Sequence, residues 1–258
     1  MADAANIRPR SDEQVIDADF VKSTFLHGVN LKTDDGVDLP DEAIDFYIQS
    51  ATRWVERELN VIILPTSISS ESHDYYWDDY ANFAFVKLLN FPVRSVSKVA
   101  IRFPLTTELL AFDDEWYRIE SVAGQVNLIP TQGSFSAILI GQGGSFLPLL
   151  YSGRDYVPHI IQVDYEAGFK DGEIPEDILH LIGMKASIGP LNIAGDLIAG
   201  AGIASKSVSL DGLSESLGTT SSATNAGYGA RIIQYEKQIK ETVSLLRRNY
   251  KGIEMVVA

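Results

Sequence analysis

The hydrophobic pattern near the start of the chain predicts two helices. Residues 40–59 carry apolar side chains three and four positions apart, the spacing of one helix face: Ile44, Ile48, Ala51, Val55 and Leu59. Pro40 suits the first position of this helix because it has a fixed φ and no N–H group. Residues 12–27 predict a shorter helix before it, with Asp17 or Asp19 as its N-cap.

The period then changes to short β-rich runs over about a hundred residues. Apolar and polar residues alternate there, as in Val99, Ile101 and Phe103, and Gly and Pro stand between the runs. The predicted strands are 61–69, 83–89, 96–103, 116–120, 124–129, 135–140 and 159–165. Several short strands with turn signals between them favour an antiparallel barrel or sandwich.

Helical spacing returns at Pro175 and again near the C-terminus. Ile178, Leu181 and Ile182 form a stripe that Gly189 and Pro190 are expected to end, and a shorter apolar piece follows. After a stretch rich in Ser, Gly and Thr, the last helix carries one apolar stripe: Ile232, Tyr235, Ile239, Val243, Leu246 and Tyr250.

These periods predict an α+β chain in which a barrel-like or sandwich-like antiparallel β part interrupts a helical bundle. The expected divisions are bundle helices over 1–60, the β part over 61–166, bundle helices over 167–202, and a flexible linker with a C-terminal helix over 203–258. A flexible linker of about 20 residues reaches roughly 25 Å. The last helix could therefore leave its own body and bind a partner. The alternative is that it packs on helices 40–59 and 175–189.

Composition excludes several classes of function. The 21 basic and 35 acidic residues give a net charge of −14, which argues against binding nucleic acid through its phosphates. Cysteine is absent, so disulfides and thiolate chemistry are excluded. We expect a soluble protein made in the cytoplasm, because no secretory signal or membrane-length apolar run is present. The last helix differs from the acidic body, with six bases and two acids over 231–251.

Motifs for cofactor or metal chemistry are weak, and we expect no catalysis, cofactor or metal. GAGIASKS (200–207) has the frame of a phosphate loop, but Ser205 replaces its second glycine. LKTDDGVDLPDE (31–42) resembles a calcium loop, but Leu31 would occupy the first ligand position. The four histidines are scattered along the chain.

YYWDDY (75–80) combines aromatic rings with carboxylates, as sugar sites do. Adjacent aspartates on a strand point to opposite faces, so Asp78 and Asp79 would not share one substrate. An aromatic contact surface or the tip of a β-hairpin is the alternative, and a carbohydrate-binding module remains a possible function.

Two segments resemble the head-to-tail adaptor (connector) proteins of tailed bacteriophages. The first is DEAIDFYIQSATRWVERELNVII, with Ile48, Ala51, Val55 and Glu56 at the family's helix positions. The second is IIQVDYEAGFKDGEIPEDILHLIGMKAS. It has Tyr165, Ala167, Gly168 and Phe169 at a strand end, and Pro175, Ile178 and Ile182 in the next helix. The tail from Ser207 to Gly252 is also similar, so the resemblance covers about residues 17–252.

The chain departs from the family pattern in two places. Its β part is much longer than the hairpin of the smallest members. Leu59 and Asn60 replace the usual Arg or Lys at the end of the first long helix.

The resemblance implies a noncatalytic structural protein of the virion neck, assembled in the host cytoplasm. Neighbouring copies would form a dodecameric ring on the portal protein, above a downstream stopper or tail protein. DNA would pass through its channel without specific binding, and no membrane is implied. A neck stopper or tail-completion protein is the alternative within the same machine.

The last helix is the expected portal contact. Its apolar stripe would supply the contact area and its basic residues the complementary charge. The expected contact residues are Arg231, Ile232, Tyr235, Lys237, Ile239, Lys240, Val243, Leu246, Arg247, Arg248 and Tyr250.

Overall fold

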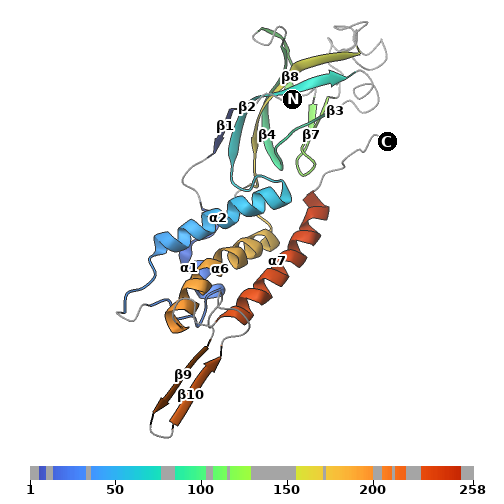
Figure 1. The fold of residues 1–258 in the computed structure, drawn as a ribbon. Helices are drawn as coiled ribbons and strands as arrows, with labels where there is room; N and C mark the ends of the chain where they lie inside the picture. Colours follow the sequence, from blue (N-terminus) through green and yellow to red (C-terminus); the bar gives the residue numbers. More distant parts are fainter. Residues whose placement is uncertain are drawn as a thin grey trace. The chain divides into compact units, whose positions relative to one another are not determined.

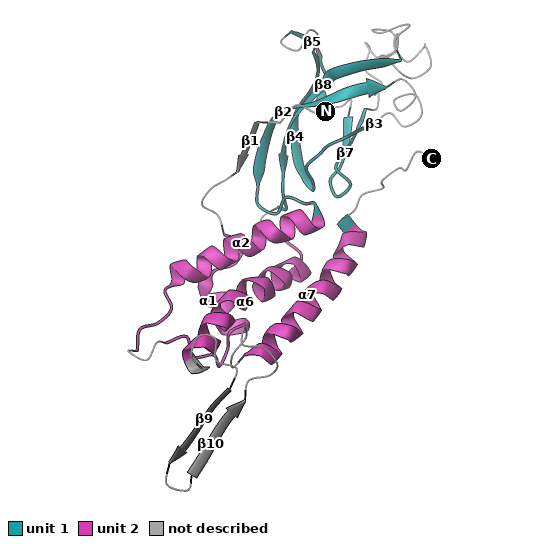
Figure 2. Cartoon of the chain, in the orientation of Figure 1, with its two compact units in different colours: residues 1–13, 60–173, 250–258 teal, residues 14–59, 174–249 magenta. Residues whose placement is uncertain are grey.

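A computed structural model describes eleven stretches of the chain: residues 6–9, 14–32, 36–76, 85–102, 107–114, 117–128, 155–170, 173–199, 205–210, 213–218 and 228–250. These divide into two compact units (Figure 2). Unit 1 comprises residues 1–13, 60–173 and 250–258, and unit 2 comprises residues 14–59 and 174–249. Among the described elements, unit 1 holds most of the strands and unit 2 holds the helices (Figure 1).

The described residues of unit 2 form four helices and one hairpin. The helices are α1 (Ala18–Thr24), α2 (Asp41–Leu59), α6 (Glu176–Ala199) and α7 (Gly229–Tyr250). The hairpin pairs β9 (Ser205–Leu210) with β10 (Leu213–Gly218). Among the described residues, no helix is both long enough and apolar enough to span a bilayer.

The first two helices follow the predicted pattern closely. Asp17 is the N-cap of α1, where its carboxylate accepts the Phe20 N–H at 2.6 Å. All five predicted apolar positions of α2 are buried: Ile44, Ile48, Ala51, Val55 and Leu59. Asn60 follows α2 with φ 55°, a left-handed conformation that Asn tolerates and that ends helices.

Helix α6 runs through Pro190, so the prediction that it ends at Gly189 and Pro190 is wrong. Proline inside a helix costs about 3 kcal/mol, but α6 buries apolar residues on both sides of it, from Ile178 and Ile182 to Leu191 and Ala194. Tertiary burial therefore outweighs the local preference. A Cβ on Gly189 would lie 2.3 Å from Tyr47 Cε1, so this glycine lets α2 and α6 approach closely.

The strands that the structure describes in unit 1 form two antiparallel sheets. The five-stranded sheet has the order β1 (Asn6–Pro9), β2 (Thr66–Tyr76), β8 (Tyr156–Ala167), β4 (Val93–Arg102) and β5 (Glu108–Ala111). The three-stranded sheet has the order β3 (Phe85–Lys87), β7 (Gln125–Leu128) and β6 (Tyr117–Glu120).

One core joins the two sheets. It includes Val99, Val163 and Tyr165 from the larger sheet and Val126 and Leu128 from the smaller one. The α+β class and the antiparallel β part are therefore confirmed. Among the described strands neither sheet closes on itself, so the β part resembles a sandwich more than a barrel.

Several strand boundaries differ from the predicted ones. The first long strand begins at Thr66 instead of residue 61, after Pro65, which has no N–H to donate to a sheet. The pattern predicted neither β1 nor β5. The predicted strand 135–140 lies outside the described residues. Because β1 pairs with β2, residues 6–9 belong with unit 1 and not with the helices.

Candidate functional site

The apolar stripe of α7 lies in the core of unit 2. Ile232 is 1% exposed, and Ile239, Val243 and Leu246 are also buried. Tyr235 packs its ring edge-on against Phe25, with the ring centroids 6.5 Å apart. This packing corresponds to the alternative in which the last helix joins the other helices of its own chain.

Polar contacts tie both ends of α7 to the first two helices and their connection. The Tyr235 hydroxyl donates to the Phe25 carbonyl at 2.9 Å, and Arg231 Nη1 donates to the His27 carbonyl at 3.4 Å. Near the other end, Arg247 Nε donates to the Glu58 carbonyl at 3.0 Å, and its guanidinium forms an ion pair with the Glu58 carboxylate. These contacts orient α7 within unit 2.

Four of the predicted contact residues are exposed on α7, and one of them, Arg247, is ion-paired with Glu58. Lys237, Lys240 and Arg248 face solvent and form no ion pair with another described residue. The eleven predicted residues thus fall into three sets. They are buried core residues, residues that contact other parts of the chain, and three basic side chains without an ion pair to another described residue.

The expected linker contains regular structure over part of its length. β9 and β10 pair from Leu210↔Leu213 to Ser205↔Gly218, while residues 219–227 lie outside the described part. The flexibility of the linker stays a prediction.

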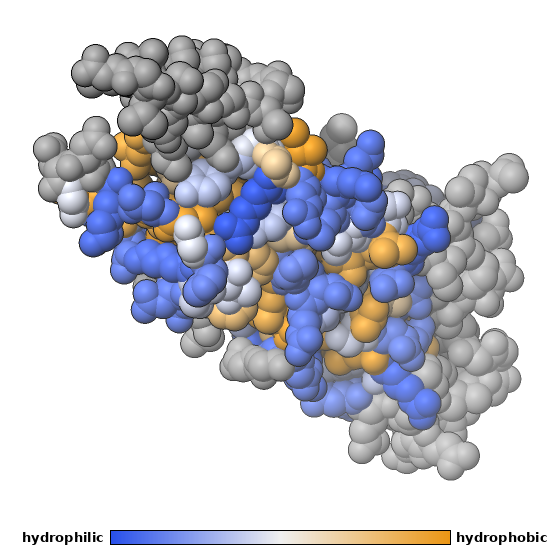
Figure 3. Space-filling view, turned by 90° about the horizontal axis from the view of Figure 1, so that it is seen from below, coloured by the Kyte–Doolittle hydropathy of each residue, from blue (hydrophilic) through white to orange (hydrophobic). Residues whose placement is uncertain are grey.

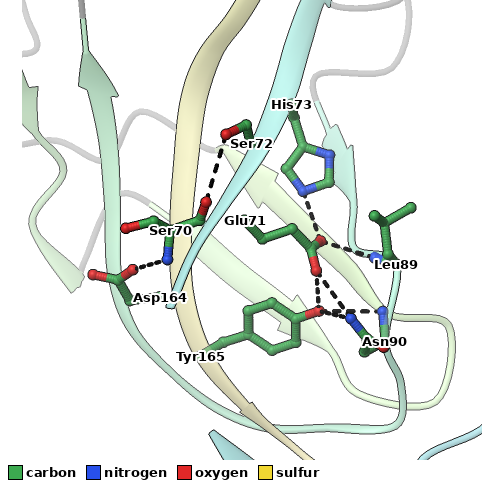
Figure 4. Close-up of polar contacts among 8 residues, drawn as sticks. All are labelled: Ser70, Glu71, Ser72, His73, Leu89, Asn90, Asp164 and Tyr165. Atoms are coloured by element: carbon green, nitrogen blue, oxygen red, sulfur yellow. Dashed lines mark hydrogen bonds and ion pairs between the residues drawn. The ribbon is translucent and has the colours of Figure 1, made fainter. Parts of the chain in front are cut away.

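Sequence reasoning missed a buried polar cluster in unit 1, drawn in Figure 4. Glu71 of β2 is 0% exposed. Tyr165 from β8, the Asn90 side chain and the Leu89 backbone reach its carboxylate from other segments. His73 lies beside it on β2. The only local signal is Glu71-x-His73, which places two ionisable residues on one face of a strand.

Every oxygen of the Glu71 carboxylate has partners. Oε2 accepts the Tyr165 hydroxyl at 2.6 Å and Asn90 Nδ2 at 3.1 Å, while Oε1 accepts the Leu89 N–H at 2.9 Å and lies 2.8 Å from His73 Nε2. Burial by itself raises the pKa of Glu71, but the hydrogen bonds from His73, Tyr165 and Leu89 outweigh it and hold the pKa below its usual value. Burial, together with the Glu71 charge, raises the pKa of Tyr165.

This cluster lies where the β2–β8 pairing shifts. Between Ile68 and Glu71 the register changes, and Ser70 has φ 58°. The Ser70 N–H, which the shift removes from the ladder, is accepted by Asp164 Oδ1 at 2.6 Å (Figure 4). The Glu71 carboxylate has no exposed surface, so it cannot contact a substrate. The cluster stabilises the irregular sheet.

Asp74 on β2 plays the same part as Asp164 on β8, because it accepts a backbone N–H at a second register shift. The register shifts again between His73 and Tyr75, and His159 has φ 52°. Asp74 Oδ1 accepts the His159 N–H at 2.8 Å. The acidic residues of these strands therefore hold two bulges in place.

The other sequence candidates do not come together as sites. Tyr75 of YYWDDY is 1% exposed in the core, so it is not available to a sugar, and residues 77–80 lie outside the described part. Tyr76 instead stacks with Tyr156, with ring centroids 4.8 Å apart. In the phosphate-loop candidate, Ser205 begins strand β9. The described residues contain no group of His, Asp and Glu that could hold a metal.

The motif Tyr165-x-Ala167-Gly168-Phe169 has a clear structural requirement. Gly168 adopts φ 120°, and a Cβ there would lie 2.7 Å from the Leu64 carbonyl oxygen. Its N–H donates to the Pro92 carbonyl, and the Phe169 N–H donates to the Ile63 carbonyl. Only glycine fits this strand end without strain.

Gly168→Ala should therefore destabilise unit 1 by about 1–3 kcal/mol, the range for a strained backbone conformation. Urea unfolding followed by tryptophan fluorescence or circular dichroism would measure the loss. Gly28→Ala is the matched control, because Gly28 also has positive φ but nothing within 4 Å of an added Cβ. An equal loss in both variants would show that the clash with Leu64 contributes nothing.

No family model and no curated protein matches the sequence. Solved structures that are similar include "Virion of native gene transfer agent (GTA) particle", with 13% identity, coverage of 95% of this chain and 97% of that chain, and a TM-score of 0.45. "Neck of empty GTA particle computed with C6 symmetry" matches with 13% identity, coverage of 70% and 81%, and a TM-score of 0.37. "Neck of native GTA particle computed with C12 symmetry" matches with 11% identity, coverage of 68% and 80%, and a TM-score of 0.36. At these TM-scores the similarity is partial and carries no argument about function.

Proposed function

We propose that this chain is a noncatalytic structural protein of a phage-like virion neck, a head-to-tail adaptor whose copies form a dodecameric ring on the portal. The ordered set of residues that resembles the adaptor family carries this proposal. Those residues have definite packing roles in the structure. Ile48, Ala51 and Val55 fill the buried face of α2, and Tyr165 and Gly168 shape the end of β8.

A structural role agrees with the chemistry of the described residues. The most enclosed ionisable group, Glu71, is saturated by donors of its own chain. The negative net charge of −14 suits a channel wall along which DNA slides, because acidic surfaces do not hold phosphates. We propose that acidic residues line such a channel.

We propose that α7 contacts the portal while it remains packed within unit 2. Releasing it would expose Ile232, Ile239, Val243 and Leu246, at a cost of about 1.5–3 kcal/mol each. Its C-terminal half keeps Arg247, Arg248 and Tyr250 exposed or half-buried, and we propose that this end binds the portal. The buried residues of the stripe then hold the helix in position for that contact.

Mass measurement of the purified protein, alone and mixed with portal protein, tests the proposal. We expect a defined ring of twelve copies on the portal and smaller species without it. A stopper or tail-completion protein would bind the tail side of a preassembled neck and leave isolated portal unbound. Failure to bind either component would contradict a role in the neck.

A further inference from the structure

We propose that neighbouring copies of this chain join through the outward face of α7 in one copy and the N-terminal half of α2 in the next. This inference deepens the proposed ring by naming its surfaces. Apolar residues are exposed in patches between polar ones on the face drawn in Figure 3. Both α7 and α2 carry an exposed large apolar side chain beside exposed charged ones, and these two sets complement one another.

The patch on α7 holds two lysines beside an apolar residue, with the exposed Glu236 and Glu241 at its edges. Ile233 is 52% exposed, and Lys237 and Lys240 are exposed on the same side of the helix, since residues three and four apart share a helix face. Neither lysine forms an ion pair with another described residue. These cations therefore remain available on a protein whose net charge is −14.

The patch on α2 is acidic with an aromatic end. Phe46 is 66% exposed, the highest value among the exposed large apolar side chains of the described residues. Glu42 is exposed one turn before it, and Asp45 is half-buried beside it. Neither acid forms an ion pair with another described residue. Arg53 and Arg57 occupy the later turns of α2, so the acidic patch is confined to its first half.

The spacing of the two patches fixes how they meet. Ile233 and Lys237 are four residues apart, and so are Glu42 and Phe46, about 6 Å along each helix. When the helices run antiparallel, Ile233 meets Phe46 and Lys237 meets Glu42. A parallel arrangement would place Lys237 against Phe46 and Ile233 against Glu42. The match of charge to charge and apolar to apolar selects the antiparallel arrangement.

A second copy is the occupant that this match indicates. Acidic copies repel one another at long range, so their association needs a local attraction such as that between Lys237 and Glu42. The two patches are different surfaces of the same unit, so the contact is heterologous. Heterologous contacts produce rings when the rotation between copies closes.

Reciprocal charge reversal tests the contact in the full-length protein. Lys237→Glu would face Glu42 of the next copy, and Glu42→Lys would face Lys237, so each variant alone creates a like-charge pair. We expect either change to weaken self-association at least about tenfold, since 1.4 kcal/mol corresponds to a factor of ten. An equimolar mixture of the two variants, or both changes in one chain, should restore it.

Sedimentation of the free protein without portal measures this association. The protein concentrations extend to about 1 mM, so that a Kd of this size is detected. Arg57→Glu is the matched control, because it reverses an exposed charge on α2 beyond the patch and should leave association unchanged. The inference is overturned if the wild-type chain stays monomeric throughout, if the single variants associate normally, or if the mixture stays as weak as its components. Portal binding is measured separately, so the adaptor proposal and this contact can fail independently.

Discussion

A chain that ends before Gly229, and therefore lacks α7, is expected to lose the folded state of unit 2. The truncation removes Ile232, Ile239, Val243 and Leu246 from the core. At about 1.5–3 kcal/mol for each buried side chain, the loss is roughly 6–12 kcal/mol. Whole domains are stable by only about 5–15 kcal/mol. It also removes the hydrogen bond from Tyr235 to Phe25 and the ion pair between Arg247 and Glu58.

Far-ultraviolet circular dichroism with thermal unfolding measures this result. The truncated chain should lose more helical signal than α7 alone contributes and should lack a cooperative transition for the remaining helices. The matched control keeps α7 and replaces residues 205–218 by a Gly-Ser linker of equal length, which should leave that transition in place. Cooperative unfolding of the truncated chain at the wild-type temperature would mean that α7 is not part of the unit 2 core.

The sequence predicted the apolar face of α7 but not what covers that face. A stripe such as Ile232, Ile239 and Val243 looks the same whether the chain itself or a partner buries it. The polar contacts of Tyr235 and Arg231 decide the question for this chain, and they end on backbone carbonyls at Phe25 and His27. A sequence pattern cannot show which backbone carbonyl accepts a hydrogen bond, because every residue has a backbone carbonyl.

Local patterns were sufficient where one element determines its own structure. The buried face of α2 and the capping of α1 by Asp17 follow from spacing and side-chain chemistry within a few residues. They were insufficient where distant segments compete with local preference. Pro190 remains inside α6 because both flanking turns are buried. The Glu71 cluster combines residues 71, 90 and 165, which only the folded sheet brings together.

Glu71→Ala is expected to destabilise unit 1 by about 3–5 kcal/mol, the range for breaking a buried charged network. The change leaves the Tyr165 hydroxyl, the Asn90 amide and the Leu89 N–H without their acceptor in a buried site, and each unsatisfied group adds its desolvation penalty. Urea unfolding at neutral pH measures the loss. Glu166→Ala on β8 is a suitable control, because its carboxylate is 40% exposed and lies 3.6 Å from Arg94 Nε. Exposed pairs of this kind contribute about 0–1 kcal/mol.

The same carboxylate should make the stability of unit 1 depend on pH in the acid range. Hydrogen bonds hold the folded-state pKa of Glu71 below its usual value despite burial, so between that pKa and the unfolded value of about 4.3 the unfolded chain binds more protons. The stabilisation by Glu71 is therefore fully present above the unfolded pKa and is lost as the pH falls through the folded one. Glu71→Gln, which cannot ionise, should show a shallower decline of unfolding free energy over this interval than the wild type. Equal slopes in the two proteins would mean that the pKa of Glu71 is the same in the folded and the unfolded chain, and that its hydrogen bonds do not favour the ionised carboxylate.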